Sequence, residues 1–382
     1  MTIKRLLVAG LSIGMILMVM LASCAPVVTD APTPTPKAPV IDTSTSVASV
    51  NPQEAAWARI VEAAKKEGTL TVYSYWWVGD QATTIAKAFR QRYGIDVQII
   101  TGKGAEFIER LKTEKRIGKI TADVFEGSAT HSQNTKDNGL LGPIADLPIL
   151  QEKTGWNMQP LIFDPTAHII LHRPWIMVPF INTNLVKPDD APKTWTDILN
   201  PKWKGKMIVP DPRVTNLTYY FVLSITHGDV PPDFIQRLAQ QDLRFVRDSS
   251  DAVRALAKGE AYLLPNATDS NVAPFAQEGA PVKAVEVDKG TIVSGGVINW
   301  VKDGPHPNAA KLFINWLMSD EGQKVEADMA GTLPMRQAVP DSRHPSIRVR
   351  VNQPLVIGVQ ENEEIAKAFL DKVIVDTLIK GK

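Results

Sequence analysis

The chain has 382 residues, of which 44% are hydrophobic, and its formal net charge is +1 at pH 7. A chain of this length and composition can form one large domain or two lobes with cores of their own. Its 42 lysines and arginines are scattered among 41 acids, which argues against a nucleic-acid-binding protein, since such proteins carry a basic surplus or a basic stripe.

Residues 1–23 have the pattern of a secretory signal peptide. Lys4 and Arg5 precede an uncharged, apolar run from Leu6 to Leu21, as in the charged start and apolar middle of such peptides. The run is shorter than the about 20 residues that a membrane-spanning helix needs. We therefore expect export rather than a membrane span.

Cys24 is the only cysteine of the chain, so a disulfide within one chain is impossible. The residues Leu21-Ala22-Ser23-Cys24 resemble the lipobox of bacterial lipoproteins, in which the thiol is alkylated with diacylglycerol and the chain is cut just before it. The resemblance implies that Cys24 becomes a lipid-bearing N-terminus, and two or more acyl chains anchor a protein stably. The alternative is an ordinary cleaved signal with a cysteine nearby.

Residues 24–51 are expected to form a tether. Proline, threonine, serine, alanine and valine dominate this stretch, a composition that cannot bury a core and favours extended, solvated chain. A folded part attached to such a linker can stand clear of a lipid surface.

From residue 52 onward, helical and strand patterns alternate. The predicted helices show apolar residues at helical spacing and end at a glycine or close to one; they cover residues 55–68, 82–94 and 106–118. The predicted strands follow them, over residues 69–76, 95–101 and 122–128. Strands separated by helices of this length favour parallel pairing with right-handed crossovers, so we expect an α/β sheet.

Two loops stand out, because ligands of open α/β sheets bind beyond the carboxyl ends of the strands. One follows the first predicted strand and the other follows the third. Backbone amides at the helix start in the second loop suit an anion or another polar group, and the alternative is plain N-capping by Ser128 or Thr130. The candidate binding residues in the two loops are Ser74, Tyr75, Trp76, Ser128, Thr130 and His131.

A second α/β region follows. Its predicted elements are a strand at 206–209, helices over 214–228 and 232–241, a strand at 243–247, a serine-capped helix over 250–259, a strand at 260–267 and an extended return segment at 291–301. This order predicts one lobe inserted in another. Lobe 1 comprises residues 52–178 and returns with the C-terminal helices at 295–382, whereas lobe 2 comprises residues 179–294.

A pair of helices is predicted after the return segment. Pro307 suits a helix start, and a stripe of apolar residues is expected to be buried: Ala310, Leu312, Phe313, Trp316 and Leu317. Ser319 or Asp320 then caps a second helix, which runs through Ala330. We interpret this segment as structural.

Three stretches resemble bacterial extracellular solute-binding proteins with the type II periplasmic-binding-protein fold, near those for ferric iron uptake. They are GTLTVYSYW, PKTWTDILNPKWKGKMIVPDPR, and GGVINWVKDGPHPNAAKLFINWLMSDEGQKV followed by GTLPMR. The resemblance implies two lobes, joined by crossing strands, that close over a solute and present it to the permease of an ABC transporter.

The crossing strands are expected near Ile176–Asn182 and Val293–Asn299. Gly295 and Gly296 lie in the second crossing. They can supply backbone freedom where closure bends the chain, or they can serve close packing alone.

The ferric binders that the chain resembles hold their metal with a His or Glu of the first lobe and an adjacent tyrosine pair of the second. Fe(III) is a hard ion that needs such oxygen-rich, anionic ligands. Here Ser128 stands where a carboxylate is expected and LPNATDSN stands where the tyrosines are expected. Tyr219 and Tyr220 fall in a helical pattern instead, so we predict no metal site and no cofactor.

The remaining candidate cleft combines polar groups with aromatic walls, and it adds Arg213, Asn216, Asn266 and Asp269 to the residues of the two loops. Arg213 beside a helix start suits a carboxylate or a phosphonate, which favours a small anionic organic solute. The alternative is an amine, caged by Trp76 and Trp77 with Asp80 or Asp269.

No catalytic residue is expected. The only GxSxG match, Gly10–Gly14, lies in the signal peptide, there is no HExxH motif, and the histidines are dispersed. Of these, only His168 and His172 could share a face, and we interpret them as ordinary polar histidines.

Two function classes stay open. The first is a monomeric, lipid-anchored, extracytoplasmic capture protein that delivers a solute to an ABC importer, and ferric iron or a polyamine remains an alternative solute. The second is an anchored sensing module without a transporter.

Overall fold

A computed structural model describes residues 51–211 and 233–356 of the chain. All of them lie in one compact unit that spans Val50–Lys382. In the part of the chain so described, no helix has the length and apolar character needed to cross a membrane.

The first region alternates helices and parallel strands as predicted. Its central strand is β1, which pairs in parallel with β2 on one side and β3 on the other. The elements are α1 (Pro52–Glu67), β1 (Thr69–Ser74), α2 (Asp80–Tyr93), β2 (Asp96–Thr101), α3 (Gly104–Arg116), β3 (Val124–Ser128), α4 (Ala129–Asp137) and the short β4 (Leu141–Gly142). Gly68 and Gly94 end α1 and α2 in left-handed conformation, which glycine adopts without steric cost.

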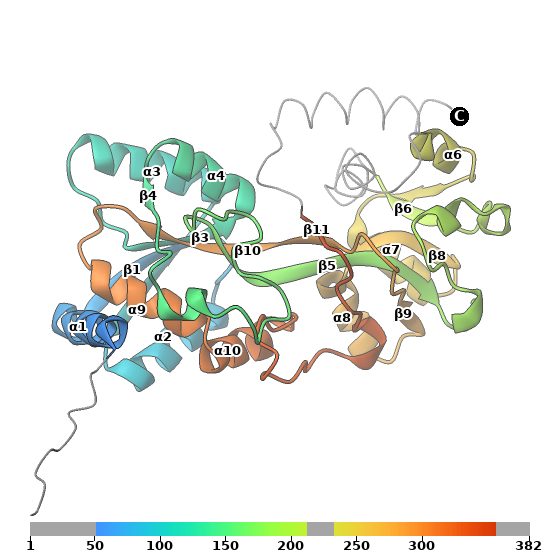
Figure 1. Cartoon of the computed structure of the whole chain (residues 1–382). Coiled ribbons are helices and arrows are strands. Elements are labelled where there is room, and N and C mark those ends of the chain that lie inside the picture. The colour runs from blue at the N-terminus through green and yellow to red at the C-terminus, as the bar shows by residue number, and fades with distance from the viewer. Residues whose placement is uncertain (1–50, 212–232, 357–382) are drawn as a thin grey trace, which may run out of the picture. The chain divides into compact units, whose positions relative to one another are not determined.

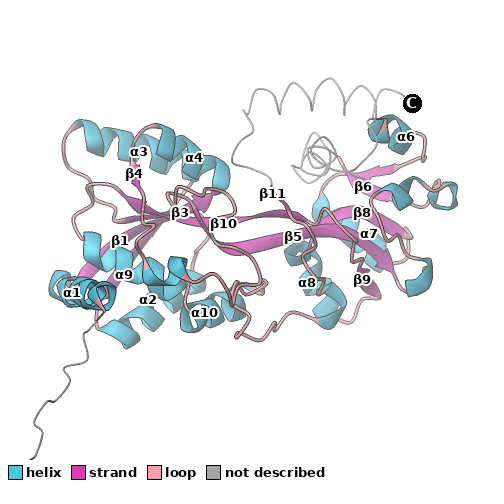
Figure 2. Cartoon of the chain, viewed as in Figure 1, coloured by secondary structure: helices cyan, strands magenta, loops and turns pink. Residues whose placement is uncertain are grey.

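Two long antiparallel strands connect the first region to the second. They are β5 (Ile170–Asn182) and β10 (Ile292–Val301), which pair with each other from Ile292–Met177 to Ile298–Ile170. β10 also lies along β3, and β5 continues along β8 (Leu263–Thr268). The two predicted crossings are confirmed, and they belong to one nine-stranded sheet whose main path is β2-β1-β3-β10-β5-β8 (Figure 2).

The second region packs short strands and helices around the far half of β5. Its remaining elements are β6 (Ile208–Pro210), α6 (Phe234–Ala239), β7 (Arg244–Val246), α7 (Ser249–Ala257), α8 (Asp269–Gln277) and β9 (Val282–Ala284). The predicted serine cap of α7 is wrong. Asp248 caps this helix, because its carboxylate accepts a hydrogen bond from the amide of Asp251 at 2.9 Å. The negative charge of this carboxylate also interacts favourably with the positive N-terminal end of the helix dipole.

The predicted helix pair is confirmed as α9 (Pro307–Leu317) and α10 (Asp320–Ala330), and the whole predicted stripe of α9 is buried. Ser319 caps α10 by accepting the amide of Gly322. Figure 1 shows α1, α2, α9 and α10 on one face of the first-region strands, with α3 and α4 on the other.

After α10 the chain returns to the second region. The turn at Pro345–Ile347 lies against α8 and β9, and β11 (Leu355–Val356) pairs in parallel with Ile292 and Val293 of β10. We call residues 331–356 the return strap; Figure 1 shows its path from α10 toward α8 and then to β11.

Candidate functional site

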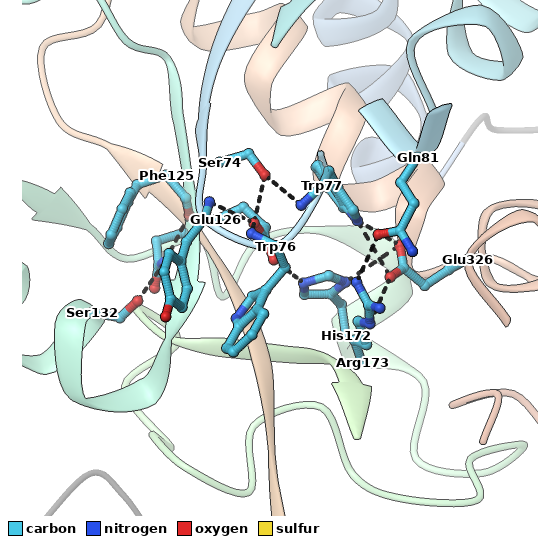
Figure 3. A network of polar contacts seen from close by, with 12 residues as sticks. Ser74, Trp76, Trp77, Gln81, Phe125, Glu126, Ser132, His172, Arg173 and Glu326 are labelled. Carbon is cyan, nitrogen blue, oxygen red and sulfur yellow. Dashed lines mark hydrogen bonds and ion pairs between the residues drawn. The ribbon is translucent and has the colours of Figure 1, made fainter. Parts of the chain in front are cut away.

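The loop after β1 is fixed by one carboxylate of the neighbouring strand. Glu126 lies in β3 and is fully buried. Its Oε2 atom accepts hydrogen bonds from the hydroxyl of Ser74 at 2.7 Å and from the amides of Tyr75 and Trp76 at 3.1 and 3.0 Å (Figure 3). Ser74 Oγ accepts in turn from the amide of Trp77 at 2.9 Å. The backbone of this loop therefore has little freedom.

Trp77 ties the same loop to α10. Its side chain is fully buried, and its indole Nε1 donates to the carboxylate of Glu326 at 3.2 and 3.3 Å. We call residues Tyr75–Trp77 the aromatic loop. Because neighbouring residues turn their side chains in different directions, Trp77 faces the core while Trp76 projects on another side of the loop (Figure 3).

The imidazole of His172, in β5, lies between two buried carboxylates. Its Nε2 is 3.5 Å from Glu126 Oε1 and its Nδ1 is 3.7 Å from Glu326 Oε2. Burial alone would lower the pKa of His172, but the negative charges of Glu326 and Glu126 outweigh burial and raise it. Arg173 adds a second cation, with its Nε 3.8 Å from Glu326 Oε1. We call Glu126, His172 and Glu326 the buried triad.

Burial would raise the pKa of Glu326, yet the adjacent His172 and Arg173 lower it. The carboxylate of Glu326 is thus held charged inside the protein, and the triad is a buried ionic group.

Half-buried aromatic rings gather on the other side of the aromatic loop. The ring of Trp76 lies 4.4 Å from that of Tyr75 and 4.5 Å from that of Trp175 in β5, both edge to face. Tyr75 also meets the ring of His131 at 5.4 Å. Aromatic pairs at these spacings stabilise each other beyond their buried area. We call Tyr75, Trp76, His131 and Trp175 the aromatic cluster.

The predicted residues of the third-strand loop divide by role. Ser128 accepts the amide of His131 at 3.2 Å and caps α4, as in the N-capping alternative. Thr130 is exposed, whereas His131 packs its ring so closely over Gly104, at the start of α3, that a Cβ there would lie 2.1 Å from the ring.

The second region brings the end of β8 to the same part of β5. Thr268 pairs with Met177, two residues beyond Trp175, and Asn266 is buried in the same strand. The loops after β1 and β3 and the end of β8 therefore converge on residues 172–177 of β5, as expected for strand ends in such sheets.

Asp269 does not offer a free carboxylate. It accepts the amides of Ile176 and Ser270 at 3.2 and 2.9 Å, and Arg343 of the return strap donates to it at 2.5 Å. Each oxygen therefore serves the chain's own donors. We read Asp269 as a structural residue, which corrects its assignment as a ligand contact.

The predicted amine cage is wrong in two of its members. The indole of Trp77 is buried and bonded to Glu326, and Asp269 is paired with Arg343. Arg213, Asn216, Tyr219 and Tyr220 lie outside the described residues, as does Cys24. Among the residues that the structure places, no group of three or more His, Cys, Asp or Glu side chains could hold a metal ion.

Sequence reasoning missed the buried triad and Trp175. The interpretation of His172 as an ordinary polar histidine overlooked its place within a strand rich in apolar residues, where a buried imidazole needs partners. An acid in an otherwise apolar strand, as in VFEGS, was the available signal for Glu126.

Comparison with known proteins gives the family. A family model described as bacterial extracellular solute-binding protein matches residues 84–348. Among curated proteins, the chain is 23% identical to the probable ABC transporter periplasmic-binding protein y4fP of Sinorhizobium fredii, over 70% of this chain and 74% of that one. It is 25% identical to a periplasmic protein of Salmonella typhimurium whose provisional name gives 2-aminoethylphosphonate as its ligand, over 67% and 75%.

The fold has close counterparts among solved structures. A Trichodesmium protein named IdiA and FutA, solved with iron and citrate, superposes with a TM-score of 0.65 at 22% identity, over 82% of this chain and 99% of that one. The two-lobed α/β fold predicted from the sequence is thereby confirmed. The names of these proteins give different ligands.

Proposed function

This chain belongs to the bacterial extracellular solute-binding proteins, and from that premise we propose that it captures a small anionic organic solute between its two lobes for an ABC importer. One of its relatives, y4fP, is named as a probable periplasmic-binding protein of an ABC transporter. We accordingly propose tight, saturable binding without turnover. The observation that carries the proposal is the aromatic cluster, which lies half-buried where the ends of β1 and β3 meet the crossing strands.

An organic solute fits this cluster better than a bare metal ion. Aromatic faces bind carbon-bearing groups, whereas Fe(III) requires anionic oxygen ligands. Glu126 and Asp269 are engaged internally, Glu126 with the aromatic loop and Asp269 with Arg343. We add Trp175 to the proposed contacts, and we retain Arg213 as the proposed partner of the solute's anionic group.

Ferric iron is the second candidate solute, because the Trichodesmium structure contains iron with citrate. For location, the family supports an extracytoplasmic protein, and we propose lipid attachment at Cys24. The lobe boundaries at residues 178 and 294 also stay a prediction.

Native mass spectrometry of the full chain, extracted in a mild detergent and never denatured, tests the proposal. We expect a retained mass that matches an organic anion and is lost after denaturation and refolding. Retained iron without an organic mass would contradict the anionic organic solute. A chain that neither retains a mass nor shifts its unfolding temperature with any tested carboxylate or phosphonate would contradict solute capture.

A further inference from the structure

The buried triad places one imidazole between the two anchors of the aromatic loop. Glu126 holds the amides of Tyr75 and Trp76, and Glu326 holds the indole of Trp77. His172 faces both carboxylates, and neither of its ring nitrogens has a hydrogen-bond partner in the described part of the chain. All three side chains are at most 1% exposed, so water does not screen these charges.

Charge balance decides which form of the imidazole fits. With a neutral imidazole, the two carboxylates face one cation, Arg173, among the residues that the structure places. An unpaired buried charge is strongly destabilising. With a protonated imidazole, each ring nitrogen lies 3.5–3.7 Å from a carboxylate oxygen, and the two cations balance the two carboxylates. The raised pKa of His172 agrees with this geometry.

Packing transmits a shift of the imidazole to the aromatic cluster. A Cβ built on Gly296 would lie 3.3 Å from both His172 Nε2 and Trp76 Cδ1. The imidazole of His172 and the indole of Trp76 therefore both pack against Gly296 of β10. The ring of Trp77 lies 5.4 Å from that of His172, edge to face. A movement of His172 would therefore displace the aromatic loop from two sides.

Within residues 51–211 and 233–356, the groups around the imidazole are as follows. β3 presents Glu126, α10 presents Glu326 together with the neutral Gln323, which donates to the carbonyl of His172, and β5 itself presents Arg173. The aromatic loop and β10 present Trp77, Trp76 and Gly296, which carry no charge.

We propose that His172 is a positioning residue, a buried cation that joins the two anchors of the aromatic loop, so that solute affinity falls when the imidazole loses its proton. The link to solute affinity rests on the function proposed above. The positioning of the loop stands on the contacts of the triad alone.

The sign of the pH dependence follows from the direction of the pKa shifts. A folded-state pKa raised above the unfolded value of about 6.5 means that the contribution is complete below that value. It is lost as the pH rises through the folded-state pKa. Since the pKa of Glu326 is lowered, its charge persists on the acid side, and the loss of affinity lies on the alkaline side.

The protonation state can be read directly. The 15N spectrum of the histidine-labelled full chain, with the resonances of His172 identified by their absence in His172→Gln, reports both ring nitrogens. We expect both to remain protonated at a pH at which His168 has already become neutral. His168 is the internal control, because burial and Lys136 lower its pKa. A His172 that becomes neutral at the same pH as His168, or at a lower pH, would overturn the proposal.

Amide exchange measures positioning without any solute. We expect the amides of Tyr75 and Trp76 to exchange about tenfold faster in His172→Gln than in the control His168→Gln, since removing the cation between the two anchors lowers the local opening energy. The double variant His172→Gln/Glu326→Gln restores neutrality with Arg173 and should recover most of the protection. Unchanged exchange in the single variant, or no recovery in the double variant, contradicts a role for the imidazole charge.

Native mass spectrometry connects positioning to solute binding. Wild-type chain should retain its solute below the pH at which the ring spectrum shows His172 losing its proton, and lose it above that pH. His168→Gln should behave as wild type, and His172→Gln should hold no solute on either side of that pH. Retention by His172→Gln on both sides overturns the affinity claim. A wild-type chain that never retains a solute contradicts the proposed function, while the ring spectrum and the exchange rates still decide the positioning role.

Discussion

Arg343 and Asp269 form an ion pair of 2.5 Å in which each side chain is only 1% exposed. The pair joins the return strap to the start of α8, and Asp341 provides a second carboxylate to the same guanidinium at 2.7 Å. Asp269 also receives the amide of Ile176 in β5. One buried carboxylate thus holds the strap, a helix and a crossing strand together.

Replacing Arg343 should be costly, because it leaves the carboxylate of Asp269 buried without its cation. We expect Arg343→Met to lower the free energy of unfolding by about 3–5 kcal/mol. The matched control is Arg350→Met, which breaks the exposed pair with Glu286 at 2.7 Å and should cost less than about 1 kcal/mol. Urea unfolding followed by circular dichroism measures both, and equal costs would contradict a special role for Arg343.

A substitution at Gly295 tests whether this glycine serves close packing or backbone freedom in the crossing strand. A Cβ at this position would lie 2.5 Å from the carbonyl oxygen of Arg173 and 2.6 Å from Leu171 Cδ1. We expect Gly295→Ala to cost about 1–3 kcal/mol of stability through overpacking. Gly296→Ala meets only side-chain atoms at 3.3 Å or more and should cost less. Unchanged stability in Gly295→Ala with altered solute binding would instead support the hinge role.

The aromatic cluster should carry solute affinity. We expect Trp175→Leu to weaken binding of the retained solute about tenfold or more, because it removes one ring of the Trp76 pair. Trp300→Leu is the control, since Trp300 lies further along β10 against Gly142. Isothermal titration with the solute identified by mass spectrometry compares the two. Equal affinities would exclude Trp175 from the site.

Glu114 should contribute to stability in a pH-dependent manner. Burial would raise its pKa, but the hydroxyl of Tyr73 at 2.6 Å, the amide of Thr121 and Arg110 together lower it. A lowered folded-state pKa gives stability that is complete above the unfolded value of about 4.3 and is lost as the pH falls through the folded value.

Glu114→Gln should therefore reduce stability at pH 6 and flatten its decline between pH 5 and 3. Urea midpoints across this range measure the effect. Glu109→Gln, on the exposed side of the same helix, serves as the control and should follow the wild-type curve. A Glu114→Gln curve parallel to wild type would contradict the prediction.

Lipid attachment predicts a change of location. Cys24→Ser should move the protein from the membrane fraction to the soluble extracytoplasmic fraction, because the acyl chains are lost. Fractionation and immunoblotting test this, with metabolic labelling by a fatty acid as the direct readout. Wild-type chain that takes up no label would contradict the anchor.

The early fold could be predicted from the sequence because its signals are local. α1, α2 and α3 combine helical periodicity with glycine at or near their ends, and the strands between them are short. The crossing strands were predicted at their observed places from the resemblance to a family. The cap of α7 was misplaced because Asp248 and two serines stand side by side, and only the backbone decides among them.

The site was less predictable, since its members meet only through the topology of the sheet. Glu126, His172 and Glu326 come from β3, β5 and α10, and nothing in the sequence relates them. Trp76 and Trp77 were predicted to act together in the alternative amine cage, but the fold turns Trp77 into the core. Asp269 was read as a ligand contact because its partner, Arg343, lies in a segment for which no contact was predicted.

The return strap and β10 also determine the order in which the regions of the nascent chain can fold. A chain that emerges N-terminus first exposes the edge of β3 until residues 292–301 arrive, and it carries Asp269 without a cation until Arg343 follows. The first region therefore needs the later strand β10, and the second region needs the later Arg343, before either can complete its fold, because these contacts join residues that are distant in sequence. Translation products that stop before Arg343 should therefore be degraded by quality-control proteases and should not bind solute with partial affinity.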